Sequence, residues 1–180
     1  PYLSMRMGVE GWENASISRG VNYTFDTSHS YLNLTSLHAT DSVDNREHTV
    51  IYDDIVVDVT RHPYMTVRYS IPCVDHSAYT QVGLRGCDNI TKWFELGSSP
   101  THGFVERTWD VRGRGLYTVT AILVRHVMNT PASTVVDTTT TLIDYVLITD
   151  DETQAKYLDV EYSYSLFESF IDTSDWHRYI

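Results

Sequence analysis

Apolar and polar residues alternate along much of this chain, in short runs separated by glycine, proline, asparagine and serine. Alternation with a period of two is typical of strands that have one buried face. The pattern predicts ten strands, at residues 21–26, 31–38, 49–60, 64–71, 79–84, 92–96, 103–110, 116–127, 138–149 and 157–165. Gly113 and Gly115 precede the eighth strand, and we expect them to form the turn of a hairpin because glycine tolerates positive φ.

A helical pattern is nearly absent; the exception is 166–171, where four apolar residues fall on one face of a helical turn. Ten strands without crossover helices predict an all-β fold, an antiparallel β-sandwich of the immunoglobulin or jelly-roll type. The two cysteines are too close in sequence for the immunoglobulin arrangement, so we favour a jelly roll. We expect a sandwich domain at 21–156, an extended N-terminal segment at 1–20 and an aromatic-rich C-terminal segment at 157–180.

The composition fits one folded domain. The chain has 180 residues, of which 42% are hydrophobic, and this is enough apolar surface to offset the entropy of ordering it. A formal charge of −11 argues against binding to nucleic acid, which needs a basic face. The sequence has no run of 18 apolar residues that would predict a membrane span, and its first residues lack the pattern of a signal peptide. If the chain is secreted, we expect this to be its mature form.

Sequons and cysteines point to an extracellular location. Four of the six asparagines begin an N-glycosylation sequon, namely Asn14, Asn22, Asn33 and Asn89. The content of serine and threonine predicts about one by chance, although a threonine-rich β protein collects sequons through composition. Cys73 and Cys87 lack metal-ligand spacing and would close a disulfide loop of about 15 residues; two independent buried thiols are the alternative. These features, with only two lysines, predict a secreted glycoprotein of the cell surface or matrix.

Three stretches, 63–70, 114–119 and 142–148, have the core spacing of sandwich strands. Through them, residues 49 to 151 resemble the galactose-binding-type jelly rolls of carbohydrate-binding modules. The resemblance implies a structural calcium ion as the one expected cofactor. The candidate ligands are Asp150, Asp151 and Glu152, with Asp53 and Asp54 as a second group. Solvated acidic turns are the alternative interpretation of both groups.

Catalytic motifs are absent from the sequence. It contains no Gly-x-Ser-x-Gly, no His-Glu-x-x-His and no phosphate-binding glycine loop, so we expect no enzymatic activity. The alternative is a weak glycosidase that uses two of the 24 acidic residues. A carbohydrate site needs aromatic platforms, and the candidates are Trp93 and Trp109, with Tyr79 and Tyr145 also available. The alternative is that these residues pack in the core.

Both ends of the chain are apolar and aromatic, whereas the termini of a monomeric domain are usually small and polar. We predict that they contact a neighbouring copy through Tyr2, Leu3, Met5, Met7, Trp12, Tyr162, Tyr164, Phe167, Phe170 and Trp176. The alternative is that they complete the sandwich of their own chain. The main hypothesis is therefore a secreted, N-glycosylated subunit of a fibril, sheath or matrix, assembled as a homo-oligomer or helical filament. The alternative is a carbohydrate-binding module or lectin that binds external glycans.

Overall fold

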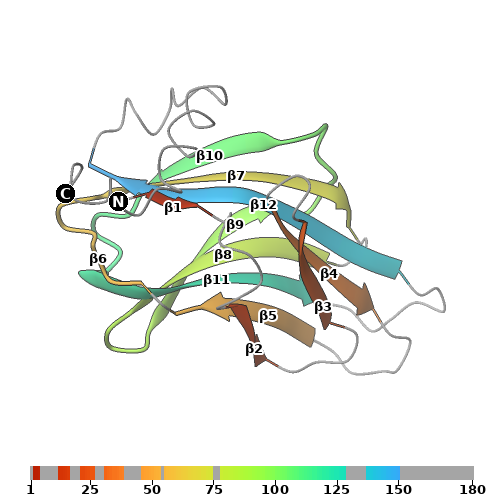
Figure 1. Ribbon diagram of the computed structural model, residues 1–180, viewed down its shortest axis with the longest axis horizontal. Coiled ribbons are helices and arrows are strands. Elements are labelled where there is room, and N and C mark those ends of the chain that lie inside the picture. The colour runs from red at the N-terminus through yellow and green to blue at the C-terminus, as the bar shows by residue number, and fades with distance from the viewer. Residues whose placement is uncertain are drawn as a thin grey trace.

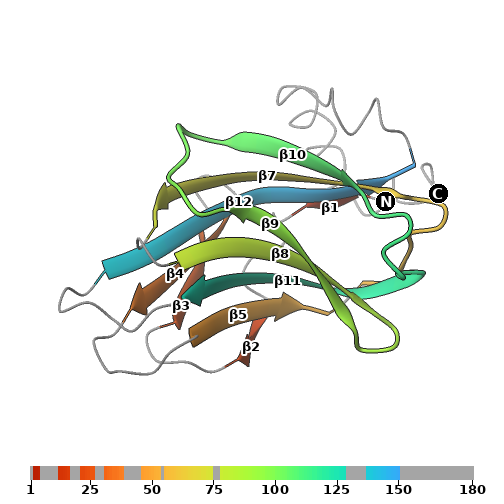
Figure 2. The ribbon, with the colours of Figure 1, turned by 180° about the vertical axis from the view of Figure 1, so that it is seen from behind.

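The fold consists of two antiparallel β-sheets packed face to face. The computed structural model describes residues 2–4, 12–16, 21–26, 31–38, 46–53, 55–74, 78–128 and 137–150. In these ranges all regular secondary structure is β-strand. Figure 1 and Figure 2 show the two layers from opposite sides. The predicted all-β antiparallel sandwich is confirmed.

In the described part of the chain, each of the two sheets contains six strands. In sheet A the order is β10 (Val105–Asp110), β7 (Tyr64–Cys73), β12 (Asp137–Thr149), β4 (Tyr31–His38) and β3 (Val21–Asp26), with β1 (Tyr2–Ser4) paired to the later part of β12. In sheet B the order is β2 (Trp12–Ser16), β5 (Arg46–Tyr52), β11 (Thr118–Met128), β8 (Ala78–Gly86) and β9 (Thr91–Gly97), with β6 (Val57–Asp58) paired to β11. Strands β10 and β9 therefore form the edges of different sheets.

The core lies between the sheets because alternate residues of each strand point inward. The fully buried aliphatic residues of this layer include Leu32, Leu34, Met65, Ile71, Leu84, Ile122, Ile143 and Ile148. They come from strands of both sheets, so each sheet covers the apolar face of the other. Removing such surface from water stabilises the sandwich by about 25 cal/mol for each Å² buried.

The connection between β10 and β11 differs from the predicted hairpin. Gly113 and Gly115 do have positive φ, 73° in each case. However, β10 pairs with β7, whereas β11 pairs with β5 and β8, so the segment 111–117 carries the chain from the edge of sheet A to the middle of sheet B. The hairpin prediction is wrong because glycines mark a sharp change of direction without specifying which strands pair afterwards.

The N-terminal segment adds strands to both sheets of its own chain. β1 pairs with β12, and β2 pairs with β5. Trp12 is directly opposite Tyr52, their ring centroids are 5.6 Å apart, and only 4% of Trp12 is exposed. Trp12, predicted to contact a neighbouring copy, is therefore a core residue of its own sandwich, because its register faces it inward.

Several predictions concern residues outside the described ranges. These are the assembly residues Met5, Met7, Tyr162, Tyr164, Phe167, Phe170 and Trp176, the strand at 157–165 and the helix at 166–171. The backbone of Tyr2 and Leu3 lies in β1. Across the ranges that are described, no helix is long and apolar enough to cross a membrane.

Candidate functional site

The outer face of sheet B carries two adjacent rows of side chains that cross four strands. Strand register aligns one row in the order Ile51, Leu123, Gly83 and Trp93, and the next in the order Thr49, Arg125, Gln81 and Glu95. Their sequence neighbours Val50, Val82 and Val124 belong to the core between the sheets, so both rows point away from it. The strands that carry these rows, β5, β11, β8 and β9, lie side by side in both views (Figure 1, Figure 2).

Trp93 lies across Gly83, its partner on the neighbouring strand. A Cβ atom built on Gly83 would stand 2.7 Å from Cζ3 of the indole and 2.8 Å from Cε3, closer than any side chain tolerates. The half-buried ring also packs against Ile51, Ala121 and Leu123, which form a small apolar cluster apart from the main core. Glycine at position 83 is therefore what allows the indole to lie low over the sheet.

Arg125 lies over the indole and is held there by two acceptors. Its Cζ atom is 3.7 Å from the centre of the Trp93 ring. Its Nε donates to Oε1 of Gln81 at 2.7 Å, and its Nη1 forms an ion pair with Oε1 of Glu47 at 3.0 Å. Thr49 donates to the same Glu47 oxygen at 2.9 Å. The Arg125 side chain is 17% exposed and that of Glu47 is 39% exposed, so solvent reaches both ends of the pair.

This arrangement offers a preorganised surface for a ligand that contains a polar ring. Stacking and two charge-assisted hydrogen bonds fix the guanidinium plane, so little side-chain entropy remains to be lost when a ligand binds. The Glu47 carboxylate balances the charge of Arg125. A few convergent polar groups beside an aromatic surface are typical of sites that bind small polar ligands.

The two main predicted platforms, Trp93 and Trp109, are not brought together. Trp93 and Tyr79 share the outer face of sheet B, where Tyr79 is opposite Val127. Trp109, on edge strand β10, packs against the main core, and its ring centroid is 5.7 Å from that of Phe94. Tyr145 lies on sheet A, is 5% exposed and donates its hydroxyl to Glu106. Trp109 is therefore separated from Trp93 and fits the alternative interpretation, a residue that packs against the core.

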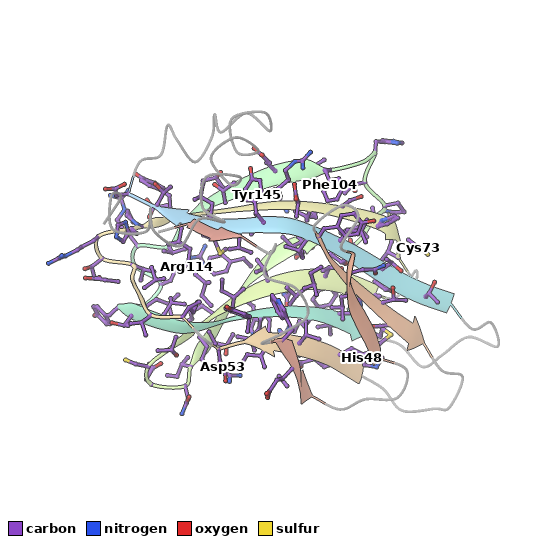
Figure 3. The ribbon with its side chains drawn as sticks, viewed as in Figure 1. His48, Asp53, Cys73, Phe104, Arg114 and Tyr145 are labelled. Atoms are coloured by element: carbon purple, nitrogen blue, oxygen red, sulfur yellow. The ribbon has the colours of Figure 1, made fainter. Side chains whose placement is uncertain are left out.

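The predicted disulfide is not formed. Cys73 and Cys87 are both free and exposed, and the Cys73 thiol donates to the Thr138 carbonyl at 3.1 Å. Cys73 ends β7 (Figure 3), whereas Cys87 follows the far end of β8, which is nine residues long. At about 3.3 Å per residue, a strand of that length separates its ends by roughly 30 Å. The sequence spacing is short, but the intervening residues form an extended strand and not a compact loop.

Two of the predicted glycosylation sites have described side chains. Asn89 is exposed in the turn between β8 and β9, with φ of 62°. Asn33 is half-buried on β4 and accepts a hydrogen bond from Thr35 of its own sequon at 3.1 Å. Asn14 and Asn22 lie in β2 and β3, and their side chains are outside the description. Asn89 therefore has the more accessible position of the two described sequons.

The acidic groups predicted to hold calcium are described in part. Asp150 is exposed and accepts a hydrogen bond from Thr149 at 3.5 Å, and Asp53 is also exposed. Asp151, Glu152 and Asp54 lie outside the description. In the described part of the chain, no three His, Cys, Asp or Glu side chains come together as metal ligands.

Sequence reasoning found Trp93 but missed the residues that surround it. Arg125, Gln81, Glu47 and Gly83 come from three strands, and no local motif joins them. Their only sequence signal is alternation, which places each on the face opposite the core once a strand register is known.

Comparisons with known proteins bear on the fold. No protein-family model matches the chain, and no curated protein matches it. Among solved structures, the glycoside hydrolase domain of Endo-D from Streptococcus pneumoniae R6 aligns with a TM-score of 0.59 and 11% identity, over 78% of this chain but only 22% of that one. The chain thus corresponds to about a fifth of the Endo-D chain.

Two carbohydrate-binding modules align over nearly their whole length. CBM27-1 of Caldicellulosiruptor saccharolyticus, solved in complex with mannohexaose, gives a TM-score of 0.52 and 12% identity over 84% of this chain and 97% of the module. A family 29 module, CBM29-2, gives 0.50 and 9% identity over 88% and 96%. At these identities the likeness concerns the fold alone. The resemblance to the β-sandwich of carbohydrate-binding modules is confirmed at that level.

Proposed function

We propose that this chain is a carbohydrate-binding module that binds neutral glycans on the outer face of sheet B. The observation that carries the proposal is the Arg125 guanidinium, which is stacked on Trp93 and held by Gln81 and Glu47. Sugar rings combine an apolar C–H face with a rim of hydroxyls. They therefore suit a surface where fixed hydrogen-bonding groups lie beside the edge of an aromatic ring, the faces of the Trp93 ring being covered by Gly83 and Arg125.

Charge favours neutral ligands over anionic ones. Arg125 is already paired with Glu47, so the site carries no unbalanced positive charge for a uronate or sulfate. The whole chain has a formal charge of −11, which repels polyanionic glycans at long range. Binding would rest on short-range hydrogen bonds and contact area, and would depend weakly on salt.

The proposed setting is extracellular, with N-glycans of the chain's own at some of its four sequons. External glycans are the proposed partner, and the proposal includes no catalytic step. The fold resemblance to whole carbohydrate-binding modules supports binding over assembly. The hypothesis of assembly through the N-terminal segment is less favoured, because β1 and β2 already pair within their own chain.

Isothermal titration against neutral oligosaccharides, chosen by an array screen that includes mannohexaose, tests the proposal. We expect Arg125→Ala to weaken binding at least tenfold, since it removes donors worth about 1.5–3 kcal/mol each when charged. Arg114→Ala is the matched control, because Arg114 also stacks on an aromatic ring, Phe94, away from this face. Thermal melting verifies that both variants are folded.

Two results would overturn the proposal. One is a wild-type protein that binds no neutral glycan on the array. The other is a ligand bound equally well by wild type and by a folded Arg125→Ala variant.

A further inference from the structure

A second aromatic and arginine cluster lies on the outer face of sheet A. Cζ of Arg68, on β7, is 4.8 Å from the centre of the Phe104 ring, which precedes β10. The Tyr31 ring, at the start of β4, is 5.8 Å from that of Phe104 and inclined to it by 51°. Figure 3 shows Phe104 at the β10 side of the molecule. Three segments far apart in sequence thus contribute to one group.

Carboxylates hold this cluster in place. Arg68 forms an ion pair with Asp144, and the two side chains are 19% and 24% exposed. Arg68 on β7 is directly opposite Glu106 on β10 and Tyr145 on β12. The Tyr145 hydroxyl donates to Glu106. Burial raises the pKa of Tyr145 well above its ordinary value, with a further contribution from Glu106, so this hydroxyl remains a donor at physiological pH.

An irregularity in β12 creates the arrangement. The register between β12 and β7 shifts between Ile143 and Tyr145, and the pairing of β12 with β4 ends at Ile143. Ile143 points into the core, whereas Asp144 and Tyr145 both reach partners on the outer face. A bulge that turns two successive side chains to one face is a common device for aiming residues at a site.

The two outer faces therefore carry the same construction. Each has an arginine stacked on an aromatic ring and fixed by a carboxylate: Arg125, Trp93 and Glu47 on sheet B, and Arg68, Phe104 and Asp144 on sheet A. The faces point in opposite directions because the sheets pack through their inner sides. One short ligand cannot reach both.

We propose that the outer face of sheet A is a second glycan-binding site and that the molecule is bivalent, bridging two glycan chains. The proposal rests on the proposed function and extends it. The ligand class is again neutral, because Arg68 is paired with Asp144 and Glu106 adds a negative charge beside them. A module with binding sites on opposite faces cross-links polysaccharide, and a module with one site does not.

Stoichiometry provides the test. With a neutral oligosaccharide that the wild type binds on the array, titration should give two sites per chain. Phe104→Ala should leave one site, Arg125→Ala should leave one, and the double variant none. Tyr117→Ala is the control, because Tyr117 is 71% exposed, belongs to neither cluster and should retain two sites. Phe104→Leu, which keeps the apolar bulk, replaces Phe104→Ala if that variant does not fold.

Cross-linking gives an independent measurement. Light scattering from a soluble neutral polysaccharide should rise when wild-type protein is added, and should not rise with either single-site variant. A wild-type stoichiometry of one, lost in Arg125→Ala and unaffected by Phe104→Ala, refutes the second site and leaves the proposed function intact. A wild-type stoichiometry of one that is lost in Phe104→Ala and unaffected by Arg125→Ala refutes the sheet B site, and it also refutes bivalency. A wild type that binds no glycan overturns both proposals.

Discussion

Acid is expected to destabilise this chain through His126, which is buried between the sheets. The side chain is 0% exposed, with Nδ1 2.7 Å from Oγ of Ser36 and Nε2 2.9 Å from Oγ1 of Thr141. His48 is directly opposite on β5 and is equally buried. Burial, and secondarily the neighbouring His48, lower the pKa of His126 to about 3.

The sign and size of the effect follow from this pKa. An unfolded chain keeps the ordinary histidine pKa of about 6.5. Between that pH and about 3, the unfolded state binds a proton that the folded state does not. The contribution of neutral His126 to the free energy of unfolding is therefore fully present above pH ~6.5. It decreases by ~1.4 kcal/mol for each unit that the pH is lowered below this value, a loss of about 5 kcal/mol over the whole window. This equals the total stability of many domains.

Urea unfolding followed by tryptophan fluorescence, in steps from pH 7.5 to 4.5, measures the slope. The comparison is His126→Gln, which can still bond to Ser36 or Thr141 but gains no charge. Asp58 and Asp110, whose pKa values are lowered by hydrogen bonds from Thr60 and Arg112, contribute only at lower pH. We expect the wild-type free energy of unfolding to decline through this range and the variant to decline less.

Equal slopes in the two proteins would refute the argument, as would a wild-type free energy that stays constant between pH 6.5 and 4.5. If His126→Gln does not fold, the imidazole resonances of the wild type decide. The His126 ring should show no titration above pH 5, and a midpoint near 6.5 would contradict its burial as a neutral group.

Two further predictions concern Trp93 and the cysteines. Gly83→Ala should push the Trp93 ring off the sheet and lower the free energy of unfolding by about 1–3 kcal/mol. It should also shift the tryptophan fluorescence to the red and weaken glycan binding. An unchanged fluorescence spectrum would contradict the packing of Trp93 on Gly83. Iodoacetamide without reductant should modify both Cys73 and Cys87 in the folded chain, since both are exposed thiols. Mass spectrometry that finds the two cysteines unmodified and linked would show that the disulfide forms after all.

Strand positions could be predicted where alternation is regular and the bounding residues favour turns. The predicted strands 21–26 and 31–38 coincide with β3 and β4, and 138–149 differs from β12 by one residue. The predicted strand 49–60 is two strands, because alternation breaks where Asp53 and Val56 are both exposed. The pairing of β10 and β11 could not be predicted, since pairing depends on long-range contacts that local pattern does not contain.

The candidate site shows the same limit. Trp93 could be proposed from residue type alone. Its role in the site depends on Gly83, which is opposite it on β8, and on Arg125, which lies in the adjacent row of the same face. The bulge that brings Asp144 beside Arg68 has no sequence signature such as glycine. Such sites become visible when register is known, because register decides which side chains share a face.

The edges of the sandwich bear on the assembly hypothesis. β9 and β10 are edge strands of different sheets, and Arg107 on β10 donates to the carbonyls of Glu95 at 2.9 Å and Leu96 at 3.3 Å on β9. The hydroxyl of Tyr69 donates to the Leu96 carbonyl as well, at 2.6 Å. An added strand on β9 would have to compete with these bonds, so this edge is protected against strand addition.

Among the described strands, the other ends of the two sheets are β10, β3 and β2, so a donated strand would join at one of these. The N-terminal segment cannot supply it without unpairing β1 or β2 from its own chain. A matrix role does not require such an exchange, however. If both outer faces bind glycan, the chain joins polysaccharides while remaining a monomer, and the structural and carbohydrate-binding hypotheses become one mechanism, in which cross-linking comes from two ligand sites and not from shared strands.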